Sequence, residues 1–190
     1  MRFREILLST AAAMVLSLAG NAYADDDDDG DDDDDGGGNA YAQCLRTDPI
    51  RFDGTIVEAA LATPELSTLA FAVQAAGLVD VLNSPGPFTV YAPLDSAFEA
   101  IPEPVLSAII ANVDLLTAVL TYHVTPGESR RLDPRRVKRS REVGTVVGQT
   151  VFYNRSDSGP QINQSNVACT PVRTSNGTVW LIDSVLLPQF

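Results

Sequence analysis

The chain has 190 residues, of which 45% are hydrophobic, and this is enough for one domain of ordinary size once non-globular ends are set aside. The formal net charge is −12, but ten of the negative charges come from two aspartate runs, residues 25–29 and 31–35. With these runs and the +1 of the N-terminal leader set aside, the remainder carries only −3. This distribution excludes a domain that attracts cations over its whole surface.

The N-terminus has the features of a secretory signal peptide over residues 1–24. Two arginines precede an apolar run at residues 6–19, and Ala22 and Ala24 are the small residues that a signal peptidase reads. The apolar run is shorter than the roughly 18 to 20 residues that span a bilayer, and no second run of that length follows. We therefore expect a secreted or periplasmic protein with no transmembrane segment after cleavage.

Residues 25–38, DDDDDGDDDDDGGG, form a low-complexity segment that we expect to be disordered, and residues 39–54 are expected to be a linker. Clustered carboxylates offer the oxygen ligands that Ca²⁺ prefers, so weak Ca²⁺ binding is one interpretation and a solvating tail is the other. The aspartates concerned are Asp25, Asp26, Asp27, Asp28, Asp29, Asp31, Asp32, Asp33, Asp34 and Asp35. No CxxC pair or group of histidines indicates a specific metal site, and no cofactor is expected.

The first half of the globular part has the apolar spacing of helices. Helices are predicted from residue 55 to 61, 64 to 76, 104 to 110 and 113 to 122. Between them, the stretch PGPFTVYAPLDSAFEAIP at residues 85–102 predicts a short strand at 88–91 and then a helical turn. Asp95 is expected to cap that turn.

After Gly127 the spacing becomes that of strands. Strand-forming runs cover residues 143–153, 166–172 and 178–187, with a hairpin turn at Asn176-Gly177. Because helices cluster in the first half and strands in the second, we expect an α+β domain whose helices pack on a largely antiparallel sheet or wedge. Contacts between the strand at 88–91 and the late strands are expected to join the two halves.

Both cysteines, Cys44 and Cys169, follow the leader and would enter a compartment in which thiols oxidise. One disulfide between them is the default expectation, and closing so long a loop would stabilise the fold by about 4 to 5 kcal/mol. Two free thiols or an intermolecular bridge remain the alternatives.

Three segments in chain order resemble the signature segments of the fasciclin (FAS1) domain. They are FTVYAPLDSAF at 88–98, LTAVLTYHVTPG at 116–127 and NGTVWLIDSVLLP at 176–188. The sequence departs from the family pattern at Leu94, Thr125 and Trp180, where the family usually has Thr, Val and His. The departure at Trp180 puts in doubt any role that the family gives to that second histidine.

The resemblance implies a FAS1 domain over residues 55–190, with a wedge of mostly antiparallel β-strands flanked by several helices. Such proteins are secreted or surface-tethered, and they are mainly associated with cell adhesion and extracellular-matrix contacts. Some secreted members resemble carotenoid binders, so the carriage of a hydrophobic ligand such as a carotenoid is the alternative function. In either case we expect no enzyme, because no GxSxG, HExxH or Walker-type motif occurs.

The candidate binding residues lie just after the fourth helix. Tyr122 and His123 are adhesion candidates by analogy with the family, and the other interpretation is that His123 caps the helix through a backbone carbonyl or a carboxylate. The segment RRLDPRRVKRSRE, residues 130–142, has seven basic residues against two acidic ones. Its cations are Arg130, Arg131, Arg135, Arg136, Lys138, Arg139 and Arg141. Such clusters recognise carboxylate, phosphate or sulfate, and the alternative is a solvated loop and edge strand.

The expected partners are an extracellular-matrix or cell-surface protein or an acidic polysaccharide, and not nucleic acid. The aspartate tail is a further candidate partner, which would shield the arginine-rich segment until a denser polyanion or Ca²⁺ competes. Asp95 and Asp183 recur in the two outer signature segments. We interpret them as a helix cap and a buried hydrogen-bond acceptor, and not as an acid–base pair.

Overall fold

The computed structural model describes residues 37–128, 130–156 and 159–189, and these residues form one compact unit. The expected signal peptide and the aspartate runs lie outside the described residues. The expectations about cleavage, disorder and Ca²⁺ binding therefore stay predictions.

Helices occupy most of the first half of the described chain. The α-helices are α1 (Gly37–Arg46), α2 (Ile56–Ala62), α3 (Ser67–Ala75), α4 (Val79–Asn83), α5 (Asp95–Glu99), α6 (Glu103–Ala111) and α7 (Val113–Tyr122). Three short 3-10 helices are η1 (Pro64–Leu66), η2 (Arg130–Leu132) and η3 (Pro134–Arg136). Helix α1 lies within the segment that the sequence suggested was tail and linker.

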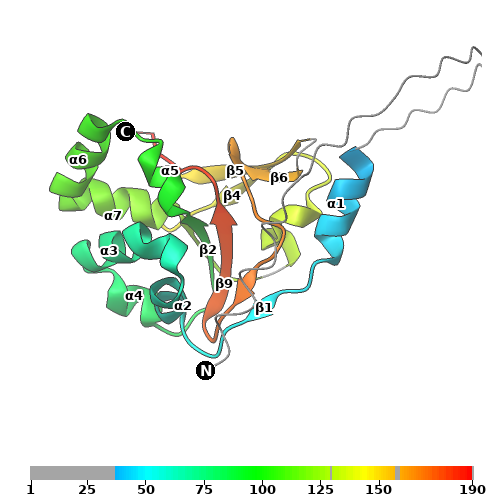
Figure 1. Ribbon diagram of the computed structural model, residues 1–190, viewed down its shortest axis with the longest axis horizontal. Helices are drawn as coiled ribbons and strands as arrows, with labels where there is room; N and C mark the ends of the chain where they lie inside the picture. The colour runs from blue at the N-terminus through cyan, green and yellow to red at the C-terminus, as the bar shows by residue number, and fades with distance from the viewer. Residues whose placement is uncertain (1–36, 129, 157–158, 190) are drawn as a thin grey trace, which may run out of the picture. The chain divides into compact units, whose positions relative to one another are not determined.

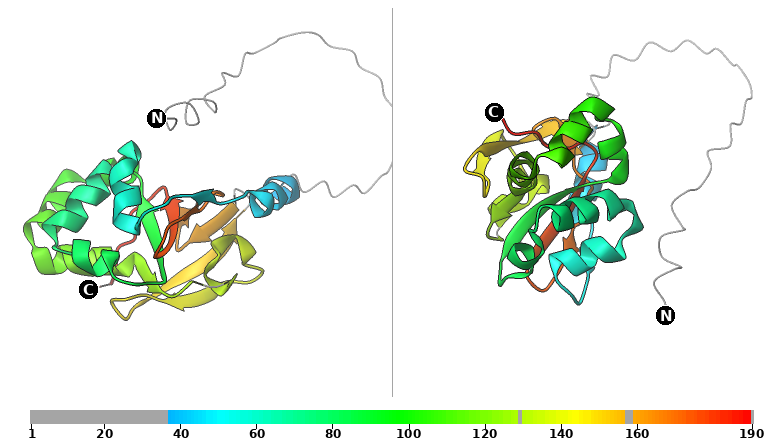
Figure 2. Two further views of the ribbon diagram at one scale, coloured as in Figure 1. Left: turned by 90° about the horizontal axis from the view of Figure 1, so that it is seen from below. Right: turned by 90° about the vertical axis from the view of Figure 1, so that its left-hand side faces the viewer.

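The strands form two sheets. They are β1 (Ile50–Arg51), β2 (Phe88–Pro93), β3 (Val124–Pro126), β4 (Arg141–Gly144), β5 (Thr150–Ser156), β6 (Gly159–Ile162), β7 (Ser165–Asn166), β8 (Val172–Arg173) and β9 (Gly177–Ile182). A five-stranded sheet has the order β1-β8-β9-β2-β3, and a four-stranded sheet has the order β4-β5-β6-β7. Helices α2 to α7 gather on one side of the five-stranded sheet, while the four-stranded sheet and α1 lie on the other side (Figures 1 and 2).

The central strands β2 and β9 join the two halves of the chain, as expected. Successive side chains of a strand point to opposite faces, and this alternation divides the interior into two cores. Val90 and Val179 pack in the apolar core under the helices. Tyr91 and Trp180 belong to a second core, which contains side chains from both sheets. Residues of the fasciclin-like segments therefore build the structural centre of the domain.

The α+β class is confirmed, and most strand pairs are antiparallel. Two pairs, β2 with β9 and β1 with β8, are parallel and were not anticipated. Parallel strands need a crossover connection, so the partners lie far apart in the sequence. A local sequence pattern carries no information about which distant strand will pair with it. The expected strand run at 143–153 is in fact a hairpin of β4 and β5.

The expected roles of the two signature aspartates are wrong in detail. Asp95 is the first residue of α5 and does not cap it; its carboxylate accepts from the hydroxyl of Ser67 at 2.7 Å and the backbone N–H of Thr68 at 2.8 Å, at the start of α3. Asp183 is an exposed residue, not a buried one, and it accepts hydrogen bonds from the backbone and side-chain amides of Asn166. Both carboxylates thus tie separate elements together.

The Asn176-Gly177 turn is a junction as well as a hairpin turn. The Asn176 side chain accepts from the backbone N–H of Ile56 at 3.0 Å and donates to the carbonyl of Leu82 at 2.7 Å. A Cβ atom on Gly177 would lie 2.2 Å from the carbonyl oxygen of Phe88, so only glycine permits β9 to approach β2 here.

Within the described residues, no single helix is long and apolar enough to cross a membrane. Two helix pairs pass the length and composition test only when taken together, Ile56–Ala62 with Pro64–Ala75 and Glu103–Ala111 with Val113–Tyr122, and they are bent by 112° and 104°.

Candidate functional site

His123 ends helix α7 and is enclosed by the fold, with 2% of its surface exposed. Its Nδ1 lies 2.7 Å from the carbonyl oxygen of Val119, and its Nε2 accepts the backbone N–H of Leu186 at 2.9 Å. Because Nε2 accepts, Nδ1 carries the proton and donates. Burial lowers the pKa of His123 to about 4, so the ring is neutral at physiological pH. The capping interpretation is confirmed.

Tyr122 is also buried, with 5% of its surface exposed. Its hydroxyl donates to the carbonyl of Thr150 at 2.9 Å and accepts from the Asn163 side chain at 3.3 Å, so it connects the end of α7 to the four-stranded sheet. A partner could touch Tyr122 or His123 directly only if that side chain left its buried position.

Thr125, which departs from the family pattern, takes part in a buried hydroxyl network. Its Oγ1 lies 3.1 Å from the Tyr91 hydroxyl, which also contacts the Tyr153 hydroxyl. Burial raises the pKa of both tyrosines, so neither hydroxyl ionises near neutral pH. The threonine therefore supplies a polar partner that valine could not.

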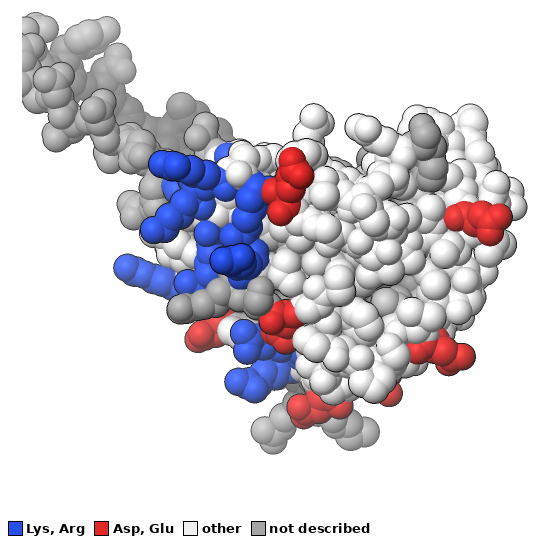
Figure 3. Space-filling view, turned by 180° about the vertical axis from the view of Figure 1, so that it is seen from behind, with Lys and Arg blue, Asp and Glu red and all other residues white. Residues whose placement is uncertain are grey.

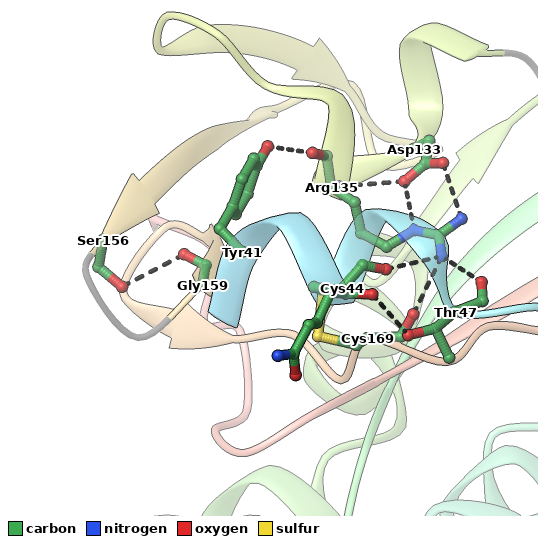
Figure 4. Close-up of a disulfide and its surroundings, with 9 residues drawn as sticks. Tyr41, Cys44, Thr47, Asp133, Arg135, Ser156, Gly159 and Cys169 are labelled. Atoms are coloured by element: carbon green, nitrogen blue, oxygen red, sulfur yellow. Dashed lines mark hydrogen bonds and ion pairs between the residues drawn. A yellow bond between two sulfur atoms is a disulfide. The ribbon is translucent and has the colours of Figure 1, made fainter. Parts of the chain in front are cut away.

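Arg135 is an interior residue of the arginine-rich segment, with 8% of its surface exposed. Its guanidinium binds both carboxylate oxygens of Asp133 at 3.0 Å and lies 5.0 Å from the centre of the Trp180 ring. Figure 4 shows how it also reaches three backbone carbonyls around the disulfide. These are the carbonyls of Cys44 (3.3 Å), Thr47 (2.9 Å) and Cys169 (3.1 Å). Arg135 is thus a structural residue. The Trp180 ring stacks against its guanidinium and helps to hold the arginine in place.

The disulfide fastens α1 to the rest of the domain. Cys44 and Cys169 are bonded across a sequence separation of 125 residues, which confirms the expected pairing. Tyr41, one turn earlier in α1, donates its hydroxyl to the carbonyl of Arg135, and Arg155 lies over the Tyr41 ring at 3.8 Å. The arginine-rich segment therefore packs against the N-terminal helix.

The other cations of the segment are more accessible than Arg135. Lys138 and Arg139 are exposed, and among the described residues neither forms an ion pair. Arg136 keeps 45% of its side chain exposed and lies 3.4 Å from Asp133. Arg141 is half-buried over the Tyr153 ring and donates to the carbonyl of Arg131, which is itself exposed. The side chain of Arg130 lies outside what the structure describes.

Charge is divided sharply between the two halves of the domain, a feature that was visible in the sequence but that motif reading missed. All eleven Lys and Arg residues beyond the leader fall within residues 46–51 and 130–173. Residues 52–129 hold no cation and nine Asp or Glu. Figure 3 shows the outcome on one face, where Lys and Arg gather at one side and the other side carries none. The basic face is thus built from the sheet half and α1.

Comparison with known proteins identifies the class. The family model for the fasciclin domain matches residues 64–188, and the chain belongs to the fasciclin family. It is 39% identical over 136 residues to Protein sll1483 of Synechocystis sp., which covers 70% of this chain and 73% of that one. It is 36% identical over 157 residues to the immunogenic protein MPB70 of Mycobacterium bovis, covering 78% of each. It is 34% identical over 138 residues to the cell surface glycolipoprotein MPB83 of Mycobacterium bovis, covering 70% of this chain and 60% of that one.

Proposed function

We propose that this protein is a secreted, non-enzymatic adhesion module that binds acidic polysaccharide at a cell surface or in a matrix. The observation that carries the proposal is the segregation of all eleven cations into one half of the domain. A predominantly basic cluster raises the local concentration of anionic partners, and guanidinium groups bind carboxylates through paired hydrogen bonds. The relatedness to a cell surface glycolipoprotein supports a location where such partners occur.

The exposed cations Lys138, Arg139 and Arg136 are the proposed contact residues, together with Arg131. Tyr122 and His123 contribute by position: they hold the end of α7 against β5 and the C-terminal segment. The segment thus meets a partner on a rigid scaffold, and the two buried side chains do not have to touch it.

The test is binding of the secreted chain to an immobilised acidic polysaccharide at two salt concentrations. At about 0.01 M salt the Debye length is about 30 Å, and at about 1 M it is about 3 Å, so a surface charge interaction should be strong in the first and lost in the second. A Lys138→Gln/Arg139→Gln variant should bind more weakly. A Glu99→Gln/Glu103→Gln variant removes two exposed charges from the helical half and serves as the control. Binding that resists both high salt and the Lys138→Gln/Arg139→Gln substitution would refute the proposal.

Deletion of residues 25–35 tests the proposed shielding of the basic face by the aspartate tail. If the tail competes with the polysaccharide, the truncated chain should bind more tightly at low salt, and the difference should vanish at high salt. Equal affinity of the two chains at low salt would rule out the shielding.

The alternative, a carrier for a carotenoid or similar ligand, rests on an apolar crevice between the helices and β2. The crevice is lined by side chains including Val57, Val73 and Leu120, but its volume is about 90 Å³. Ligand pockets usually measure about 300 to 1,000 Å³, so a carotenoid would need the helices to separate. A visible absorbance band in the purified protein would favour this alternative.

A further inference from the structure

A polar cleft of about 550 Å³ opens where α1 and the residues after it face the arginine-rich segment. Its floor includes Thr89 of β2 and Thr178 of β9, which lie opposite each other in the parallel pair, and Trp180 of β9. These three side chains share the sheet face that points away from helices α2 to α7, since the intervening Val90 and Val179 pack under those helices. The volume is that of a site for a small molecule or for part of a chain.

Three arginines from separate elements line the cleft, and we name them the rim arginines: Arg46 at the end of α1, Arg136 of η3 and Arg173 of β8. All three are exposed. Among the described residues Arg46 forms no ion pair. The one ion pair of Arg136 in this part of the chain joins its Nε to the Asp133 carboxylate, which already accepts two hydrogen bonds from the Arg135 guanidinium.

Arg173 is also available to a ligand. Its Nε lies 3.9 Å from Oε1 of Glu128, and their side chains are 55% and 38% exposed. An exposed pair at this separation adds little to stability, so Arg173 can turn to another anion at small cost. The rim arginines thus present guanidinium donors from three separate elements to one cleft.

The cleft is lined by acidic as well as basic side chains, and this limits the kinds of ligand that could bind there. Glu128, Asp133 and Asp48 also line it, and the Glu128 carboxylate accepts from the Thr178 hydroxyl at 2.6 Å. Carboxylates repel a compact, densely charged anion, but they accept hydrogen bonds from hydroxyl groups. A ligand with one carboxylate among several hydroxyls matches this mixture of donors and acceptors.

We propose that this cleft binds one or two carboxylate-bearing sugar residues of an acidic polysaccharide, with the rim arginines on the sugar carboxylate and Glu128 on its hydroxyls. The inference rests on the proposed function, in which the chain binds such a polymer, and it assigns the residues that distinguish a uronic acid from any other polyanion. Lys138 and Arg139, on the arginine-rich segment, then contact other parts of the polymer and do not distinguish a uronic acid from other anionic sugars.

The test uses the single tryptophan of the chain, Trp180, as a reporter inside the cleft. A short oligomer of galacturonic acid is titrated into the secreted chain while tryptophan fluorescence is recorded, with its uncharged methyl ester and dextran sulfate as matched ligands. An Arg46→Gln/Arg173→Gln variant removes two rim arginines, and Arg51→Gln/Arg155→Gln removes two exposed charges of the same sign outside the cleft and outside the proposed polymer contacts. Thermal unfolding of both variants checks that they remain folded.

The acid oligomer should change Trp180 fluorescence, and the rim variant should bind it at least about 10-fold more weakly, while the control variant changes this affinity by less than about 3-fold. Equal binding of the methyl ester would overturn the assignment of a carboxylate site. If the rim variant and the control variant weaken binding of the acid oligomer alike, the cleft is not the site, although the proposed function stands. Failure of every polyanion to bind would overturn both.

Discussion

Acidification should destabilise this protein through its one histidine. Burial lowers the pKa of folded His123 to about 4, while the unfolded chain keeps the ordinary value near 6.5. Above pH 6.5 the ring is neutral in both states, and its contribution to stability is fully present. Between these two values the unfolded state binds a proton that the folded state does not, so stability falls as the pH falls.

The magnitude follows from the two pKa values. From pH 7 to pH 5, the free energy of unfolding should decrease by about 2 kcal/mol through His123 alone. The loss should reach about 3 kcal/mol once the pH is below the folded pKa, since each pKa unit corresponds to about 1.4 kcal/mol. The structural cause is the burial of the ring, which disfavours its charged form and outweighs the opposing effect of the hydrogen bond to the Val119 carbonyl.

The assay is chemical denaturation at pH 7, 6 and 5 for the parent chain and for His123→Gln. The variant should lose about 1 to 3 kcal/mol at pH 7, because the Leu186 N–H and the Val119 carbonyl lose well-placed partners. Its stability should then change much less between pH 7 and pH 5. Parallel losses in both proteins would show that another group carries the pH dependence and would refute the reasoning.

Two further predictions concern the N-terminal attachment. Arg135→Met should lower the free energy of unfolding by about 3 to 5 kcal/mol, because the Asp133 carboxylate loses its buried partner and three backbone carbonyls lose a donor. The exposed Arg139→Met should change it by less than about 0.5 kcal/mol. Denaturant titration measures both, and a loss below about 1 kcal/mol at Arg135 would contradict the structural role. Reduction of the disulfide between Cys44 and Cys169 should lower the denaturation midpoint by an amount equivalent to about 4 to 5 kcal/mol. A thiol reagent should not label the unreduced, denatured chain. Stoichiometric labelling would count against the bridge.

Much of the secondary structure was predictable because its cause is local. The apolar spacing of residues 113–122 and the aromatic and β-branched run at 88–91 predict α7 and β2, and both are present. The partners of these elements were not predictable in the same way. Strand β2 pairs in parallel with β9, about ninety residues later, and the carboxylate of Asp95 caps α3 instead of its own helix.

The candidate site divides along the same line. Charge counts along the chain determine that the domain has a basic half, because charge belongs to the residue type and needs no fold. They do not distinguish Arg135 from its neighbour Arg136, although one is buried among carbonyls and the other lines an open cleft. That difference depends on α1, which lies about ninety positions before Arg135 in the sequence and packs against it. The disulfide to Cys169 holds α1 in this place.

The sequence by itself thus determined the family resemblance, the helical and strand-rich halves and the presence of a basic segment. The tertiary structure alone decided that Tyr122 and His123 are buried and that the rim arginines line one cleft. The physical reason is that periodicity and charge are properties of neighbouring residues, whereas burial and a binding cavity require contacts between residues that are distant in the chain.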